Sequence, residues 1–253
     1  MLKRLIIALL LLAVYACSDP PLVVWEQHSL TESELDDCAN EPCPDITINY
    51  TLAKGEGTVS ESINTQIEAR MMAVFTNAED APNSLEDAIQ SFTKRYQELL
   101  TDFPESAGAD NYEAQVEVTN HGQIGNIASL EHWAYLYEGG AHGWSGSDFL
   151  NFDLRTGTQL SMDDLFTDQK TLLDIAEKAF RDSRELPENG SLNEQGGFWF
   201  DEDRFRLPET VGIGIKGLLI IYNPYDIASY ADGSIEFTIP LEQIEHLINP
   251  DLL

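Results

Sequence analysis

The chain has 253 residues, and its 44 Asp and Glu against 14 Lys and Arg give a formal net charge of −30. This charge excludes nucleic acid as a natural partner, because phosphate binding needs basic residues, and it disfavours adsorption to anionic lipid head groups. It is compatible with attraction of a cationic protein, although solubility alone is the simpler reason for such acidity. The length suffices for one large or two small domains with a hydrophobic core.

The first 17 residues have the pattern of a bacterial lipoprotein signal. Lys3 and Arg4 precede the apolar run 5–16, which is too short to span a membrane, and the small residue Ala16 stands before Cys17. We expect residues 1–16 to be removed and Cys17 to be lipidated. The protein would then be anchored in the cell envelope, on the periplasmic face or outer membrane of a Gram-negative bacterium. The alternative is an ordinary signal peptide with an incidental cysteine.

Residues 17–43 are polar and acidic, so we predict a tether between the lipid and the folded part. Two cysteines remain besides Cys17. Outside the cytoplasm this even number predicts a disulfide between Cys38 and Cys43. A metal clip is the alternative, but the nearest histidine is His28 and the sequence has no second cysteine pair.

The rest of the chain is predicted to be α+β, with antiparallel sheets and helices packed on one face, in two modules over residues 44–135 and 136–250. Period-two alternation indicates strands in the first module, and apolar stripes at helical spacing indicate helices. The elements expected there are strands over 45–52 and 112–121, two further strands, a helix over 62–75, and a helix from the capping box Ser84–Asp87 to near Pro104.

Signals for the second module begin with the glycine-rich loop that follows the strand at Trp133. They include alternation, a capping box and a hairpin signal. The elements expected are a strand over 149–154, a tight turn over 155–158, a short helix capped by Ser161, a helix striped from Leu172 to Phe180, a polar insertion over 183–200, two strands within 210–222 that meet at Lys216-Gly217, a strand over 234–241, and a helix over 241–248.

Two stretches resemble a known bacterial extracytoplasmic module. They are the run YEGGAH…FLNFDLRTG…LSMDDLF, which ends at Phe166, and IYNPYDIASYADGSIEFTIPLEQI over 221–244. The chain is similar over about residues 44–250 to the domain of unknown function shared by RsiV-type lysozyme-sensing anti-sigma factors and PdaC-type peptidoglycan deacetylases. The motif residues are Asp153, Gly157, Asn223, Pro224 and Tyr225.

The resemblance implies a fold more than an activity, because this family has no activity common to all its members. Nothing in the chain matches the separate metal-dependent catalytic domain of the PdaC type. The cytoplasmic sigma-binding segment and spanning helix of the RsiV type have no match either. RsiV-type modules can bind lysozyme, so the resemblance makes a lysozyme-like cationic protein a candidate partner.

The glycine-rich loop is the candidate binding loop, formed by Tyr137, Gly139, Gly140, His142 and Trp144. Exposed aromatic side chains supply contact area to a ligand at low entropic cost. For Trp144, and for Trp199 in a second glycine-rich loop, the sequence leaves open whether the side chain binds a ligand or anchors the fold.

A hydrolase acting on peptidoglycan or glycan through His142 is the alternative function. Ser145 and Asp148 are near His142 in sequence, but three such residues within one loop seldom reach the geometry of a catalytic triad. The run over 143–147 misses G-x-S-x-G by its last residue and does not lead from a strand into a helix. We therefore expect no catalytic residue.

Metal sites are not predicted either. His121, His132 and His142 could meet on neighbouring strands, but they lack the short spacing typical of zinc ligands. Asp201-Glu202-Asp203 has oxygens suited to calcium, without the surrounding loop sequence that calcium sites use. The sequence thus predicts an envelope lipoprotein without a cofactor that binds a protein or a cell-wall glycan and contacts the membrane only through its lipid.

Overall fold

A computed structural model describes residues 23–35, 38–39, 41–78, 80–104 and 111–253. The expected signal peptide and Cys17 lie outside these ranges. Within them, no helix is both long and apolar enough to cross a membrane. The strands are β1 (Trp25–Thr31), β2 (Asp45–Ala53), β3 (Glu113–Ile124), β4 (Ile127–Tyr137), β5 (Trp144–Asp153), β6 (Thr158–Gln159), β7 (Gly212–Gly214), β8 (Gly217–Tyr222) and β9 (Ile235–Ile239). The α-helices are α1 (Thr58–Phe75), α2 (Leu85–Asp102), α3 (Met162–Leu165), α4 (Gln169–Ser183), α5 (Leu192–Gly196) and α6 (Leu241–Ile244).

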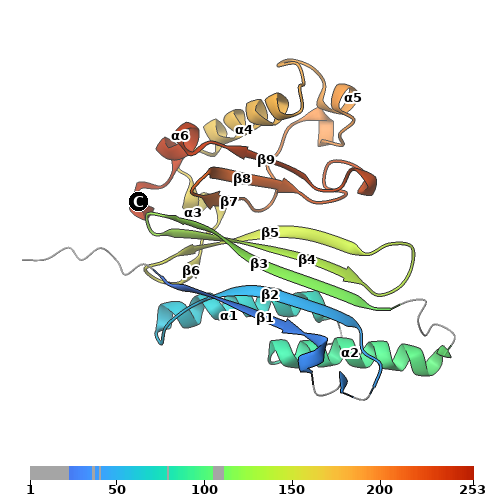
Figure 1. Cartoon of the computed structure of the whole chain (residues 1–253). Helices are drawn as coiled ribbons and strands as arrows, with labels where there is room; N and C mark the ends of the chain where they lie inside the picture. Colours follow the sequence, from blue (N-terminus) through green and yellow to red (C-terminus); the bar gives the residue numbers. More distant parts are fainter. Residues whose placement is uncertain (1–22, 36–37, 40, 79, 105–110) are drawn as a thin grey trace, which may run out of the picture.

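The elements form four layers (Figure 1). Helices α1 and α2 cover one face of a six-stranded sheet in the order β1-β2-β3-β4-β5-β6. The opposite face of that sheet packs against a second sheet, β7-β8-β9, and α4 lies on the outer side of the second sheet. The predicted α+β class, with helices on one face of each sheet, is confirmed. The expectation of wholly antiparallel sheets is wrong at one place: β2 and β3 pair in parallel, because α1 and α2 form the crossover between them.

Two hydrophobic cores fill the spaces between the layers. The predicted helical stripe of α1 is buried as Ile63, Ile67 and Met71, and it packs against the helix side of the six-stranded sheet. The second core lies around Phe180 of α4 and Tyr222 of β8. Burial of one Ile, Met or Phe side chain of these cores contributes about 1.5–3 kcal/mol to stability.

Strand β1 lies in the stretch expected to be a tether. Residues 25–31 pair antiparallel with β2 at the edge of the sheet, and Trp25 and Leu30 pack against the first core. The acidic residues around Trp25 and Leu30 hide the strand pattern in the sequence. Pairing with β2, rather than the β propensity of its own residues, stabilises this strand. Further along the same stretch, Cys38 and Cys43 form the expected disulfide, with their Cα atoms 5.4 Å apart.

The expected division of the modules at residues 135 and 136 falls inside β4. Strands β5 and β6 continue the first sheet as far as Gln159, because β5 pairs with β4 along ten residues from Trp144 to Asp153. The strand expected to begin at Phe149 therefore begins at Trp144. The polar insertion over 183–200 contains the short helix α5, which the sequence analysis did not predict.

The strand registers place Trp25 and Trp144 at opposite ends of the six-stranded sheet. Trp25 pairs with Ala53, at the finishing end of β2. The starting end of β2 is level with Trp144 through successive pairs: Asp45 with Glu113, Glu113 with Tyr137, and Leu136 with Trp144. Figure 1 shows the start of β1 at the left of the sheet and the β4–β5 loop at its right.

Candidate binding surface

The glycine-rich loop lies against the segment over 223–230, so the two sequence motifs meet in space. The imidazole of His142 stacks on the ring of Tyr230, with 4.2 Å between ring centroids. The Tyr230 hydroxyl donates to the Gly143 carbonyl at 3.1 Å. These two contacts fix the position of a loop that is otherwise exposed at Gly140 and His142.

The remaining loop residues hold its shape. The Tyr137 hydroxyl donates to the Gly140 carbonyl across the loop at 3.0 Å. Gly139 and Gly140 both have positive φ, 90° and 95°, and open space where a side chain would stand. The loop therefore depends on these two residues for its backbone conformation rather than for close packing.

We call four residues of the loop, of β5 and of the 223–230 segment the aromatic surface: His142, Trp144, Tyr225 and Tyr230. The rings of His142 and Tyr225 both pack against Tyr230. Tyr225 and Tyr230 are 5.8 Å apart between ring centroids. Trp144 and Tyr225 are 55% and 58% exposed, unusually high for side chains of this size. Large exposed apolar side chains beside one another are a common mark of an interaction site.

Asn223 explains why the motif Asn-Pro-Tyr stands beside the loop. Its side-chain oxygen accepts from the Ser147 amide at 2.6 Å, and its side-chain nitrogen donates to the Ser147 carbonyl at 2.9 Å. The backbone N–H of Asn223 donates to the Asp226 carboxylate at 2.8 Å, which closes the turn. Tyr225 has a φ of +75°, a conformation that costs a side-chain-bearing residue free energy and that the turn sustains.

A cavity of about 260 Å³ lies beside the aromatic surface, at the open edge of β5. Gly146 allows the indole of Trp144 to form one wall, because a Cβ on Gly146 would stand 2.9 Å from Cζ2 of that ring. Residues of the 206–210 segment also line it. The polar and charged lining residues are Arg70, Ser147, Asp148, Arg206, Glu209, Thr210, Asn223 and Asp226.

Asp148 at this cavity belongs to a charged cluster on the helix side of the sheet. Arg70 of α1 donates to Asp148 through Nε at 2.6 Å and also through Nη2. The buried His132 places Nδ1 3.5 Å from Asp148 Oδ2. Burial opposes ionisation of Asp148, but the contacts with His132 and Arg70 outweigh it and lower the pKa of the carboxyl. The partners of the Asp148 carboxylate are therefore Arg70 and His132 rather than His142.

A second polar chain lies on the opposite face of the sheet. The Ser147 hydroxyl donates to Glu131 Oε1 at 2.8 Å, and Glu131 Oε2 is 2.9 Å from His121 Nε2. Hydrogen bonding to His121 and then to Ser147 lowers the pKa of the Glu131 carboxyl, against the effect of burial. In the series Ser147–Glu131–His121, the carboxylate of Glu131 is in the middle and the imidazole of His121 is at the end. A serine nucleophile needs the imidazole next to it, so this order does not reproduce a catalytic triad.

The three histidines considered as metal ligands have separate partners: Glu131 for His121, Asp148 for His132 and Tyr230 for His142. Across the described residues there is no group of three or more His, Cys, Asp or Glu suited to a metal ion. In the acidic turn, Asp203 accepts from the Asn193 amide at 2.8 Å near the start of α5.

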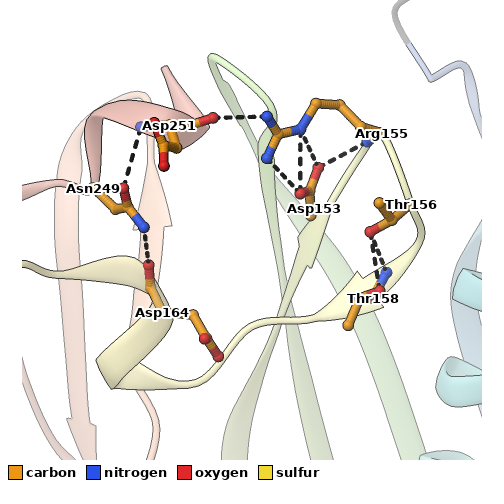
Figure 2. Close-up of polar contacts among 7 residues, drawn as sticks. All are labelled: Asp153, Arg155, Thr156, Thr158, Asp164, Asn249 and Asp251. Atoms are coloured by element: carbon orange, nitrogen blue, oxygen red, sulfur yellow. Dashed lines mark hydrogen bonds and ion pairs between the residues drawn. The ribbon is translucent and has the colours of Figure 1, made fainter.

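The motif residues Asp153 and Gly157 hold the turn after β5. Asp153 pairs with Arg155, whose guanidinium also donates to the Asp251 carbonyl at 2.7 Å near the C-terminus (Figure 2). Gly157, with φ of +73°, presents its carbonyl to Ser62 and Gln66 of α1. These contacts join the turn to α1 on one side and to the end of the chain on the other, so the two residues serve the fold.

Sequence reasoning identified the loop and the Asn-Pro-Tyr turn but not the residues around them. Arg70, Glu131, Arg206 and Glu209 carry no local motif, since they come from three separate segments: α1, β4 and the 206–210 segment. A basic residue on the exposed side of α1 and an acid on β4 are ordinary in sequence. The packing of α1 and the 206–210 segment against β5 brings Arg70, Arg206 and Glu209 to one cavity, whereas Glu131 lies on the other face of the sheet.

Solved structures show the same fold. A member of the DUF3298 family from Bacteroides fragilis NCTC 9343 is 22% identical, with 92% of this chain and 96% of that chain covered and a TM-score of 0.69. A DUF3298 family protein from Pseudomonas aeruginosa PAO1 is 18% identical, with 93% and 99% covered and a TM-score of 0.63. No curated protein matches the chain. Residues 163–242 match the family described as "Protein of unknown function (DUF3298)", so this part of the chain resembles a DUF3298 domain.

Proposed function

We propose that the chain is the non-catalytic binding domain of an envelope lipoprotein, and that it binds a protein or a cell-wall glycan through the aromatic surface. The observation that carries the proposal is the exposure of Trp144 and Tyr225, 55% and 58%, on the two segments that the Asn223 side chain joins. Tyr and Trp are the residues that most often supply binding free energy at interfaces.

The surface is held in place before a ligand arrives. Asn223 fixes the turn to β5 through two hydrogen bonds, and Tyr230 fixes the loop through its hydroxyl and its stacked ring. A surface that is already ordered loses less side-chain and loop entropy on binding. The arrangement therefore favours recognition over a role in folding alone.

The contacts of His142 support binding over hydrolysis. Its Nδ1 is 2.9 Å from the Gly143 carbonyl and its ring stacks on Tyr230, whereas Asp148 pairs with Arg70. A general base needs an orienting carboxylate and a nucleophile within hydrogen-bond distance. Hydrolysis of peptidoglycan or glycan through His142 remains the competing proposal.

The binding test uses full-length protein in detergent, because of the apolar run 5–16. Its probes are insoluble peptidoglycan, in a pelleting assay, and a basic lysozyme. We expect the wild type to bind one probe and the double variant Trp144→Ala/Tyr225→Ala to lose that binding. Phe103→Ala is the matched control, since Phe103 is 53% exposed but lies beyond the end of α2.

Three outcomes decide between the readings. Binding by the wild type and by Phe103→Ala, with loss in the double variant, supports the proposal. Unchanged binding in the double variant, or failure of the wild type to bind either probe, refutes it. Release of soluble products from peptidoglycan, abolished by His142→Ala, would establish the hydrolase in its place.

The envelope location is part of the proposal and rests on the sequence pattern before Cys17. We expect wild-type protein to fractionate with membranes and the Cys17→Ser variant to leave them. The control is Cys38→Ser, which removes a cysteine of the disulfide and leaves the lipid site intact. Equal membrane retention of the Cys17→Ser variant would exclude a lipid anchor at this residue.

A further inference from the structure

We infer that the cavity beside Trp144 is a saccharide site that takes one uncharged pyranose ring. The inference rests on the proposed binding function and names the class of ligand. It depends on three features of the cavity: one aromatic wall, unpaired donors and acceptors beside it, and a balance of charge that disfavours anions.

The aromatic wall is the indole of Trp144. Because Gly146 has no side chain, the ring lies across that residue, and a Cβ there would also meet Asn223 Cγ at 3.4 Å. The ring is 55% exposed, so its outer area is free for contact. A flat π-surface of this kind suits the apolar face of a pyranose ring, whose C–H groups meet the negative face of the indole.

Two side chains with hydrogen-bonding capacity left over, Arg206 and Glu209, line the cavity together with the indole. Arg206 donates through Nη2 to the Asp226 carbonyl at 3.0 Å, which leaves its other N–H groups directed elsewhere. Glu209 is exposed and forms no ion pair with any described residue. A sugar hydroxyl both donates and accepts, so a guanidinium and a carboxylate on one wall match neighbouring hydroxyls.

The charges around the cavity select a neutral ring. Arg70 is neutralised by Asp148, so the remaining charged groups of the lining are the guanidinium of Arg206 and the carboxylates of Glu209 and Asp226. A further anion would meet repulsion from both, in a protein of net charge −30. The volume of about 260 Å³ is below that of pockets for drug-sized ligands, which suits a single ring of a longer glycan.

The test is an NMR titration of the full-length protein in detergent with two neutral trisaccharides, one of N-acetylglucosamine and one of glucose. The chain has four Trp, so it has four indole N–H signals. Trp144→Phe assigns the signal of Trp144. We expect one trisaccharide to shift that signal, Trp144→Ala to weaken binding at least tenfold, and Glu209→Gln to weaken it several-fold.

Trp199→Ala is the matched control, because Trp199 is 53% exposed and does not line the cavity. Unchanged affinity in this variant supports the inference. Equal loss in Trp144→Ala and Trp199→Ala would place the sugar outside the cavity and overturn it. So would the absence of any shift with either trisaccharide while peptidoglycan or lysozyme still binds, an outcome that leaves the proposed function standing. Failure of every probe would refute both.

Discussion

The side-chain amide of Asn223 hydrogen bonds to both backbone polar groups of Ser147, 76 residues away in the chain, at 2.6 and 2.9 Å. It thereby occupies the place that one residue of a neighbouring strand would take. Strand β6 pairs only with Phe152 and Asp153, so the earlier part of β5 has no strand beside it on this edge. There the Thr210 hydroxyl accepts from the Phe149 backbone N–H, and the Leu160 backbone N–H donates to the Asn151 carbonyl. An edge covered in this way is protected from pairing with other chains.

We expect Asn223→Ala to destabilise the protein by about 1–3 kcal/mol, because it leaves the amide and carbonyl of Ser147 without protein partners. Urea unfolding monitored by Trp fluorescence measures this. The control is Asn189→Ala, at an exposed residue of the segment after α4. If both variants unfold at the same urea concentration as the wild type, the pairing contributes nothing to stability.

Gly157→Ala is expected to cost at least about 2 kcal/mol, from backbone strain and from steric overlap together. Gly157 has φ of +73°, and an added Cβ would stand 2.7 Å from the Val59 carbonyl oxygen. Gly139→Ala separates the two causes, since Gly139 also has positive φ but nothing within 4 Å of the added Cβ. Thermal unfolding of the two variants compares them. Equal losses would show that crowding against α1 does not matter.

Glu131 should make folding sensitive to acid. Its pKa lies below the ordinary 4.5 because of hydrogen bonds to His121 and Ser147. A carboxyl with a lowered folded-state pKa contributes stability that is complete above the ordinary pKa and is lost as the pH falls through the lowered one. The difference in unfolding free energy between wild type and Glu131→Gln should therefore be largest above about pH 4.5 and shrink below it. Urea titrations from pH 7 to pH 3 measure it, with the exposed Glu236→Gln as control. A pH-independent difference would contradict the assignment.

If the ligand is a basic lysozyme, its association rate should fall steeply with salt. The net charge of −30 attracts a cationic protein at long range, and the screening length falls from about 10 Å at 0.1 M salt to about 3 Å at 1 M. Association kinetics at both salt concentrations test this, beside an unrelated acidic protein of similar charge. Equal binding by that protein would mean that charge alone is responsible. A salt-independent rate would exclude steering.

Local signals predicted local structure well. Ser161 starts α3 with the expected capping box, whose residues are only three positions apart. Ser84 caps α2 by accepting from the Asp87 backbone N–H, but the Asp87 carboxylate accepts from Asn83 rather than from Ser84, so the box is half formed. The parallel pairing of β2 with β3, and the addition of β1 to the edge, depend on contacts across the chain. Neither leaves a mark in a short window of sequence.

The candidate site shows the same limit. His142, Trp144 and Asn223 were recognisable from their motifs, but no pattern in sequence joins Asn223 to Ser147. The partners of Asp148 come from α1 and β4, so its engagement with Arg70 and His132 depends on how the helix crosses the sheet. The hypothesis of a triad near His142 was built on closeness in sequence, whereas alternation along β5 sends Ser145 and Asp148 to opposite faces.

The opposite placement of Trp25 and Trp144 along the six-stranded sheet has a consequence for the proposed lipid anchor. Trp25 is level with Ala53 and Trp144 with the start of β2, and the residues of β2 from Asp45 to Ala53, at about 3.3 Å per step, separate the two ends by roughly 26 Å. If Cys17 is acylated, the bilayer lies on the Trp25 side, a few residues before β1 begins. The start of β1 would then be the part of the domain nearest the membrane, and Trp144 would lie at the end of the sheet that points away from it.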